Sequence, residues 1–191
     1  CGGLKSASIP DGVSEIGSYA FYNCSGLASV TLPAGITGIG AYAFSGCADL
    51  AELVLPESTV SVGENAFSGC EKLIEKEGGV SYVGKWAIDC DESAVTVQLR
   101  ADTAGIADNA FYGCREMTSI TIPGGVTGIG AEAFYNCAAL TTVAIPGGVE
   151  SIGYGAFYGC AELTDITLPA GVESIGRDAF NGCTKLTDVA L

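Results

Sequence analysis

The chain has 191 residues, of which 48% are hydrophobic, and it carries a formal net charge of −14. This acidic balance argues against binding to nucleic acid or to anionic membrane surfaces, because both require clustered Lys and Arg. No apolar run approaches the ~18 residues that a membrane span needs, so we expect no membrane insertion by this segment. The length suits one ordinary domain or one array of repeats.

A period of 23 residues runs through the chain from its first residue. All seven Phe lie three residues before a Cys, and all six Pro lie nine residues after one. Two series of cysteines keep the period, namely Cys1, Cys24, Cys47 and Cys70, then Cys114, Cys137, Cys160 and Cys183. A fixed period of this length indicates a solenoid. We therefore expect residues 1–191 to form a single solenoid of about eight 23-residue repeats. Because the chain begins and ends inside a repeat, we also expect it to be a fragment of a longer protein.

Each repeat contains the same short elements in the same order. In the repeat that begins at Cys114, apolar residues alternate over 120–122, which predicts a short strand with one buried face. Pro123 ends this strand, since proline has no N–H for a ladder. Gly125 allows a turn, and Ala133-Phe134 predicts a short helical turn that closes the coil. Stacked repeats would place these strands in one parallel sheet and each Cys, Leu and Phe on its counterpart. The expected fold class is a β-rich repeat protein.

An irregular segment, residues 74–100, interrupts the period. Val80 and Tyr82, then Trp86 and Ile88, alternate around Val83-Gly84-Lys85, which predicts a β-hairpin. One interpretation is that Tyr82 and Trp86 fill the space left by a missing Phe. The other is that the hairpin protrudes and that Trp86, the only tryptophan, contacts a partner, since insertions in solenoids often lie on a functional face.

The chemistry of common active sites and metal sites is missing from the sequence. There is no histidine, which excludes Ser-His-Asp and Cys-His nucleophilic sites. The cysteines are 20 or more residues apart and form no C-x-x-C, so we expect no zinc site and predict reduced, buried thiols that act as small hydrophobic residues. The acidic stretch around Asp89 to Ser93 lacks the spaced Gly and distal Glu of a calcium loop, and we interpret it as solvated. We expect no enzyme activity, no cofactor and no metal.

The repeat resembles the BspA-like leucine-rich repeat family of bacterial cell-surface proteins. The residues that carry this resemblance are the strand motif Leu140–Pro146 and the segment Ile152–Cys160, which ends in A-F-x-x-C. The resemblance implies a right-handed leucine-rich-repeat solenoid with short helical turns. It also implies an extracellular, cell-surface-attached protein associated with adhesion. The asparagine ladder of other leucine-rich repeats is replaced here by a Pro-x-Gly turn.

Two functions of different classes remain open, and the resemblance makes the first the one that we expect. The first is an adhesin-like module that binds a protein or glycan on a host or neighbouring cell. The second is a structural spacer that presents another domain. The candidate contact residues are the central strand positions and the hairpin aromatics, namely Thr31, Val54, Gln98, Thr121, Ala144, Thr167, Tyr82 and Trp86. The strand positions include no Trp, Tyr or Arg, the residues that dominate binding hot spots, and this favours the spacer.

Overall fold

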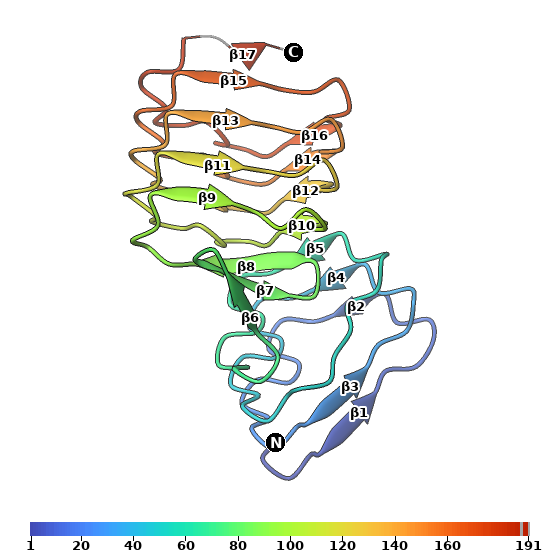
Figure 1. Cartoon of the computed structure of the whole chain (residues 1–191). Coiled ribbons are helices and arrows are strands. Elements are labelled where there is room, and N and C mark those ends of the chain that lie inside the picture. The colour runs from blue at the N-terminus through green and yellow to red at the C-terminus, as the bar shows by residue number, and fades with distance from the viewer. Residues whose placement is uncertain (188, 191) are drawn as a thin grey trace.

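The computed structural model describes residues 1–187, 189 and 190, and these form a β-solenoid (Figure 1). Each regular coil contributes a three-residue strand, a two-residue strand and a side built from turns. We call the sheets of three-residue strands the main sheets and those of two-residue strands the second sheets. All pairing between regular coils is parallel, and equivalent residues of successive coils lie opposite one another, as in Ile120 opposite Val143. The expected solenoid of short parallel strands is confirmed.

The strands divide into two main sheets, two second sheets and an inserted meander. The main-sheet strands are β1 (Ser6–Ser8), β3 (Ser29–Thr31), β9 (Thr96–Gln98), β11 (Ser119–Thr121), β13 (Thr142–Ala144), β15 (Asp165–Thr167) and β17 (Val189–Ala190). The second-sheet strands are β2 (Glu15–Ile16), β4 (Gly38–Ile39), β5 (Ser61–Val62), β10 (Gly105–Ile106), β12 (Gly128–Ile129), β14 (Ser151–Ile152) and β16 (Ser174–Ile175). The meander comprises β6 (Glu75–Glu77), β7 (Val80–Val83) and β8 (Trp86–Cys90).

The turn side of each coil contains no helix among the described residues, so the expected short helical turns are wrong. Along this side, backbone hydrogen bonds within a coil alternate with backbone hydrogen bonds to the next coil. The amide of Tyr135 donates to the carbonyl of Glu132 at 3.0 Å, whereas the amide of Phe134 donates to that of Ala156, one coil further on, at 2.7 Å. The residue before each repeat Cys adopts a positive φ and is always Gly or Asn, as at Asn23, Gly46, Gly69, Gly113, Asn136, Gly159 and Gly182. Left-handed residues at this spacing break a helix and free amides to bond the next coil.

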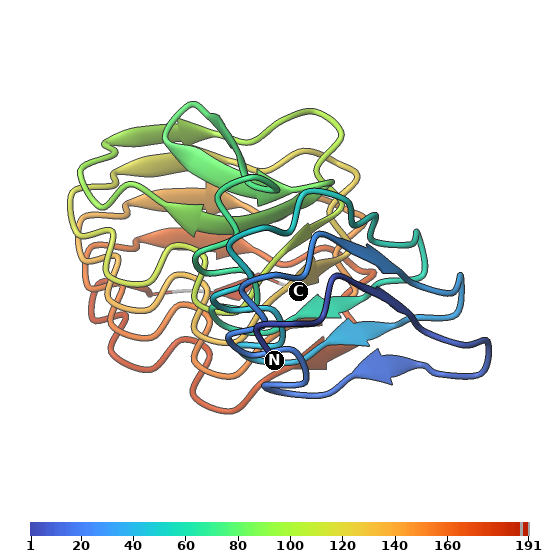
Figure 2. The same ribbon diagram turned by 90° about the horizontal axis from the view of Figure 1, so that it is seen from below.

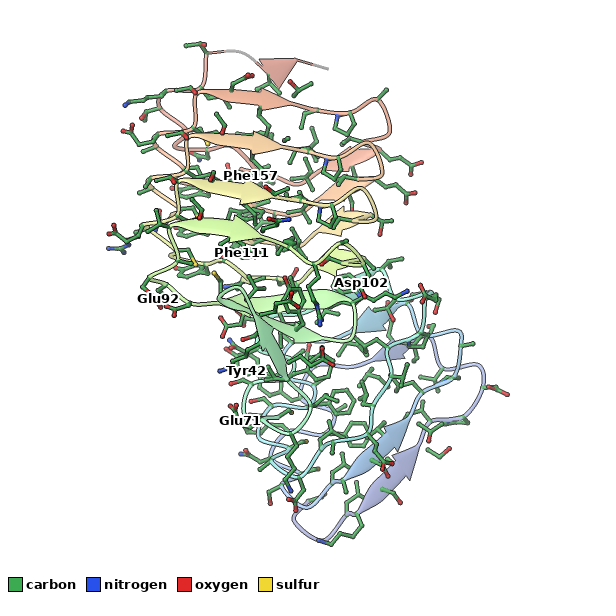
Figure 3. All side chains as sticks on the ribbon, viewed as in Figure 1. Tyr42, Glu71, Glu92, Asp102, Phe111 and Phe157 are labelled. Carbon is green, nitrogen blue, oxygen red and sulfur yellow. The ribbon has the colours of Figure 1, made fainter. Side chains whose placement is uncertain are left out.

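The core is a set of ladders in which each side chain packs on its own copy. Phe21, Phe44 and Phe67 stack in one ladder, and the other runs from Phe111 to Phe180, with centroid separations of 5.0 to 5.6 Å in both. Phe111 and Phe157 point into the interior of the C-terminal coils (Figure 3). Parallel-offset aromatic pairs of this kind contribute roughly 0.5–1.5 kcal/mol each beyond their burial.

The cysteines form a second ladder behind the phenylalanines, and no disulfide joins them in the described part of the chain. Their thiols donate to the carbonyl of the Phe one coil earlier, as from Cys137 Sγ to the Phe111 oxygen at 3.1 Å. Burial, followed by the charge of a neighbouring cysteine, raises the pKa of Cys70 and of Cys160 to about 12. A thiol with so high a pKa is a poor nucleophile at neutral pH. Cys1 is exposed and Cys183 is half-buried, so the expected burial holds for the seven cysteines between them.

The period breaks at Lys76, where the main-sheet strand of the fourth coil should form. The equivalent position is apolar in the other coils, at Ala7, Val30, Leu53, Val97, Ile120, Val143, Ile166 and Val189. A lysine ammonium cannot enter the apolar ladder without a partner. Strand β6 therefore leaves the main sheet and pairs antiparallel with β7, and β7 pairs antiparallel with β8. Strand β8 then rejoins the solenoid by parallel pairing with β10, with Trp86 opposite Gly105.

The meander separates two stacks of coils, which we call the N-terminal stack (residues 1–70) and the C-terminal stack (residues 91–187). Their main-sheet strands run in different directions, and the stacks are displaced sideways when seen along the solenoid (Figures 1 and 2). The second sheets meet where the Asp108 amide donates to the Val62 carbonyl at 2.9 Å. Ala107 makes the bond of a regular coil, donating to the Ala87 carbonyl of β8 at 2.9 Å, as Gly130 does to Ile106 at 2.9 Å. The hydrogen bond to the N-terminal stack is therefore made one residue later than the regular bond between coils.

The hairpin aromatics lie inside the protein, so the interpretation that Tyr82 and Trp86 fill space in the core is confirmed, and the alternative of an exposed Trp86 on a protruding hairpin is wrong. Tyr82 is fully buried and Trp86 is 4% exposed. Arg100 caps Tyr82, with its guanidinium carbon 3.9 Å from the ring centroid and its backbone amide donating to the phenol oxygen at 3.3 Å. The aromatic rings occupy the volume that the diverted coil no longer fills, because an unfilled core volume would cost stability.

We expect Gly153→Ala to lower the free energy of unfolding by about 1–3 kcal/mol, the cost of overpacking a close contact. A Cβ on Gly153 would collide with the backbone amide of Ala131 in the preceding coil. Gly147→Ala in the same coil is the matched control, since a Cβ there meets nothing within 4 Å. Urea unfolding of both variants checks this, and equal midpoints for the two variants would contradict the close-approach argument.

We expect a thiol reagent at neutral pH to modify one cysteine quickly in the native protein and all nine after denaturation. The rapid site is Cys1, because it alone is exposed. Mass spectrometry of the labelled protein identifies the site. Rapid native labelling of Cys137 or Cys160, or fewer than nine labels in denaturant, would show that the ladder is open or disulfide-bonded.

Candidate interaction surfaces

The predicted strand-face residues form one surface only in the C-terminal stack. Gln98, Thr121, Ala144 and Thr167 are exposed on successive strands from β9 to β15, with Gln98 opposite Thr121 and Ala144 opposite Thr167. These four residues define what we call the main-sheet face. The surface between β11 and β15 is a shallow concavity of about 430 Å³, with Asp165 on its border.

Thr31 and Val54 lie apart from this face. Thr31 is exposed on the separate two-stranded sheet, opposite Ser8. Val54 is 81% exposed and follows Glu52, which forms an isolated bridge with Ser29. The continuous row expected from Thr31 to Thr167 is therefore wrong, because the diversion of β6 removes the strand that would connect the two sheets.

The main-sheet face offers hydrogen-bonding groups on a flat, rigid support. Hydroxyls, one amide and one methyl group recur at the strand spacing, and no described residue of this row is aromatic or cationic. A neighbouring row of threonine hydroxyls is already used within the fold, as from Thr141 Oγ1 to the Thr118 carbonyl at 3.1 Å. The four exposed positions are thus available to a partner, as are Thr96, Thr142 and Asp165, which are exposed on the same strands. Such a face suits extended polar contacts rather than a single deep anchor.

A row of tyrosines lies on the turn side. Tyr112, Tyr135 and Tyr158 stack with centroid separations of 5.0 and 4.8 Å, and Tyr19 stacks on Tyr42 at 5.0 Å. Partial desolvation, followed by the neighbouring Tyr158 and Tyr112, raises the pKa of Tyr135. Because each ring is covered by the next, the row presents ring edges and hydroxyls rather than open ring faces.

The joint between the stacks contains a groove that the sequence did not predict. We call it the joint groove. It has a volume of about 470 Å³ and lies between the third main-sheet segment, residues 51–55, and the tip of the meander. Its apolar lining comes from Leu53, Val54, Leu55, Leu73, Ile74 and Trp86. Two ion pairs flank it, Lys85 with Glu57 at 2.7 Å and Lys72 with Asp49 at 2.6 Å. The signal that could have revealed it is Lys76 at an otherwise apolar position.

A smaller cavity of about 150 Å³ lies elsewhere in the joint, lined by polar groups that include Lys76, Asp89 and Asp108. Desolvation raises the pKa of both carboxyl groups, and the Ala131 amide donates to Asp108 Oδ1 at 2.7 Å. The described residues contain no group of three or more potential metal ligands. In the acidic loop, Asp91 accepts hydrogen bonds from the amide and hydroxyl of Ser93 at 2.9 and 2.7 Å, as in an ordinary Asx turn.

No helix in the described part of the chain is long and apolar enough to cross a membrane.

Comparison with known proteins identifies the repeat. The family model described as the BspA type leucine-rich repeat region matches in six copies over residues 1–104 and 104–191. No curated protein gives a significant match. The resemblance noted in the sequence is therefore confirmed over the whole chain.

Several solved structures are similar to this chain. A leucine-rich cell surface protein from Faecalibacterium prausnitzii A2-165 is 26% identical with a TM-score of 0.55, over 98% of this chain and 59% of that protein. A leucine-rich repeat protein of T. pallidum is 30% identical with a TM-score of 0.49, over 97% of this chain and 79% of that protein. The pneumococcal vaccine antigen PcpA has a TM-score of 0.61 at 20% identity, over 97% of this chain and 61% of that one, and shows the fold alone.

This chain thus spans about three fifths of the first of these proteins. The match to the family model covers the full repeat array, including both stacks on either side of the meander. The chain belongs to the BspA-type leucine-rich repeat family.

Proposed function

We propose that this chain is a non-enzymatic, extracellular interaction module that binds a protein or glycan on a host or neighbouring cell. The observation that supports this most directly is the main-sheet face, a rigid row of exposed Gln98, Thr121, Ala144 and Thr167 on successive strands. The ladders beneath fix the strands that carry these side chains, so binding would not have to order the backbone of this surface first. The cell-surface description of the similar protein from F. prausnitzii supports an extracellular, surface-attached location.

A structural spacer is the second candidate, and a specific observation favours it. The described part of the main-sheet face has no Trp, Tyr or Arg, the side chains that most often anchor protein interfaces. A stack of coils bonded only to their neighbours also makes a stiff rod that could hold another domain away from a surface.

A binding screen separates the two functions. We expect the chain to bind at least one extracellular matrix protein or glycan, and we expect Thr121→Arg to weaken that binding by about tenfold, or 1.4 kcal/mol, because a long cation would stand in the centre of the face. Thr127→Arg is the matched control, because Thr127 is exposed on the same coil but precedes the second sheet. Biolayer interferometry measures both variants against the same immobilised partner.

Absence of binding at tens of micromolar, where contacts of about −6 kcal/mol begin to show, would favour the spacer. Equal loss of binding in the two variants would remove the main-sheet face from the proposal.

A further inference from the structure

The third main-sheet segment has a neighbour on one side only. In a regular coil, the amide at the central apolar position donates to the next coil, as Val30 does to the Glu52 carbonyl at 2.9 Å. The corresponding amide of Leu53 has no backbone partner among the described residues. Residues 51–55 therefore present an open strand edge.

This edge forms one wall of the joint groove. Leu53 and Leu55 contribute apolar side chains to the lining, and Val54 between them is 81% exposed. Trp86 also lines the groove. The buried Thr59 also lines the groove, and its Oγ1 has no hydrogen-bond partner among the described residues. An open edge with an apolar wall and an unsatisfied buried hydroxyl is an environment that a further chain would complete.

The geometry points to a peptide-binding site: we propose that the joint groove accepts an extended peptide from a partner protein, which adds a parallel strand to residues 51–55. Strand addition supplies main-chain hydrogen bonds, and alternate side chains give specificity. The chemistry that fits is that of the chain's own coils, an extended segment with apolar residues at alternate positions. Lys85 and Lys72 already pair with Glu57 and Asp49, so the groove does not require a charged peptide.

This inference deepens the proposed function, since it assigns protein binding to a surface other than the main-sheet face. The two are separable by experiment, because the groove test uses a synthetic peptide and a groove variant, whereas the proposed function is tested with whole matrix proteins and glycans.

The probe is a capped peptide with the sequence of residues 163–169, Leu-Thr-Asp-Ile-Thr-Leu-Pro, which forms a main-sheet strand in this fold. Trp86 is the sole tryptophan of the chain and lines the groove, so its fluorescence reports on occupancy. We expect saturable binding to the 191-residue chain, with a change in Trp86 emission and a matching heat signal by calorimetry.

Two modified peptides test whether binding depends on hydrogen bonds from the peptide main chain. In the solenoid, the amide of Thr164 donates to the Thr141 carbonyl of the preceding coil at 3.1 Å. The amide of Ile166 faces the following coil instead. We therefore expect N-methylation at Thr164 to abolish binding and N-methylation at Ile166 to reduce it far less. Equal binding of the two modified peptides would overturn strand addition.

Two protein variants test the location. Val54→Asp should weaken peptide binding by about tenfold or more, and Ala144→Asp, at the same coil position in the C-terminal stack, should leave it unchanged. Equal effects, or no binding by calorimetry to the unmodified chain, would overturn the proposal. Concentration-dependent self-association that Val54→Asp abolishes would also overturn it, because the occupant would then be a second copy of this chain.

Discussion

Every coil lies one strand spacing from the next, and this single constraint explains most of the structure. At that distance each side chain contacts the equivalent side chain of the next coil. A residue type is therefore tolerated at a position only if it packs well against another residue of the same type. Phenylalanine does so with centroids 5.0 to 5.6 Å apart, and small thiols fill the space behind it. Where a coil crosses close to its neighbour, as at Gly153, even a methyl group collides with backbone. The repetition of residues in the sequence is the direct consequence.

The same constraint explains the joint. Because coils contact only their neighbours, one coil that cannot extend the ladder interrupts the whole array. Lys76 is that point, and the chain responds by turning β6 into an antiparallel meander whose aromatic side chains seal the core. The seal is incomplete at the main-sheet side, where residues 51–55 keep an open edge beside the joint groove. An interruption in a regular scaffold thereby creates the feature that most distinguishes this chain from a uniform rod.

The sequence predicted the features that depend on period and missed those that depend on local backbone or on new pairing. Cys, Phe and Pro spacing predicted the parallel solenoid and its ladders. The turn side was wrongly expected to be helical, although Gly or Asn before each Cys, as at Asn136, indicates a left-handed residue there. Trp86 could not be placed from sequence, because its burial depends on β8 pairing with β10 across the interruption. The joint groove was missed because a lysine at one position does not reveal which partner its strand will choose.

Native-state hydrogen exchange at single residues tests most directly whether the main sheet is open at the joint. The account predicts that the amide of Leu53 exchanges much faster than the amide of Val143, which occupies the position of Leu53 in a fully paired part of the array. Protection of Leu53 equal to that of Val143 would contradict the account, because it would mean that the edge of residues 51–55 is already covered.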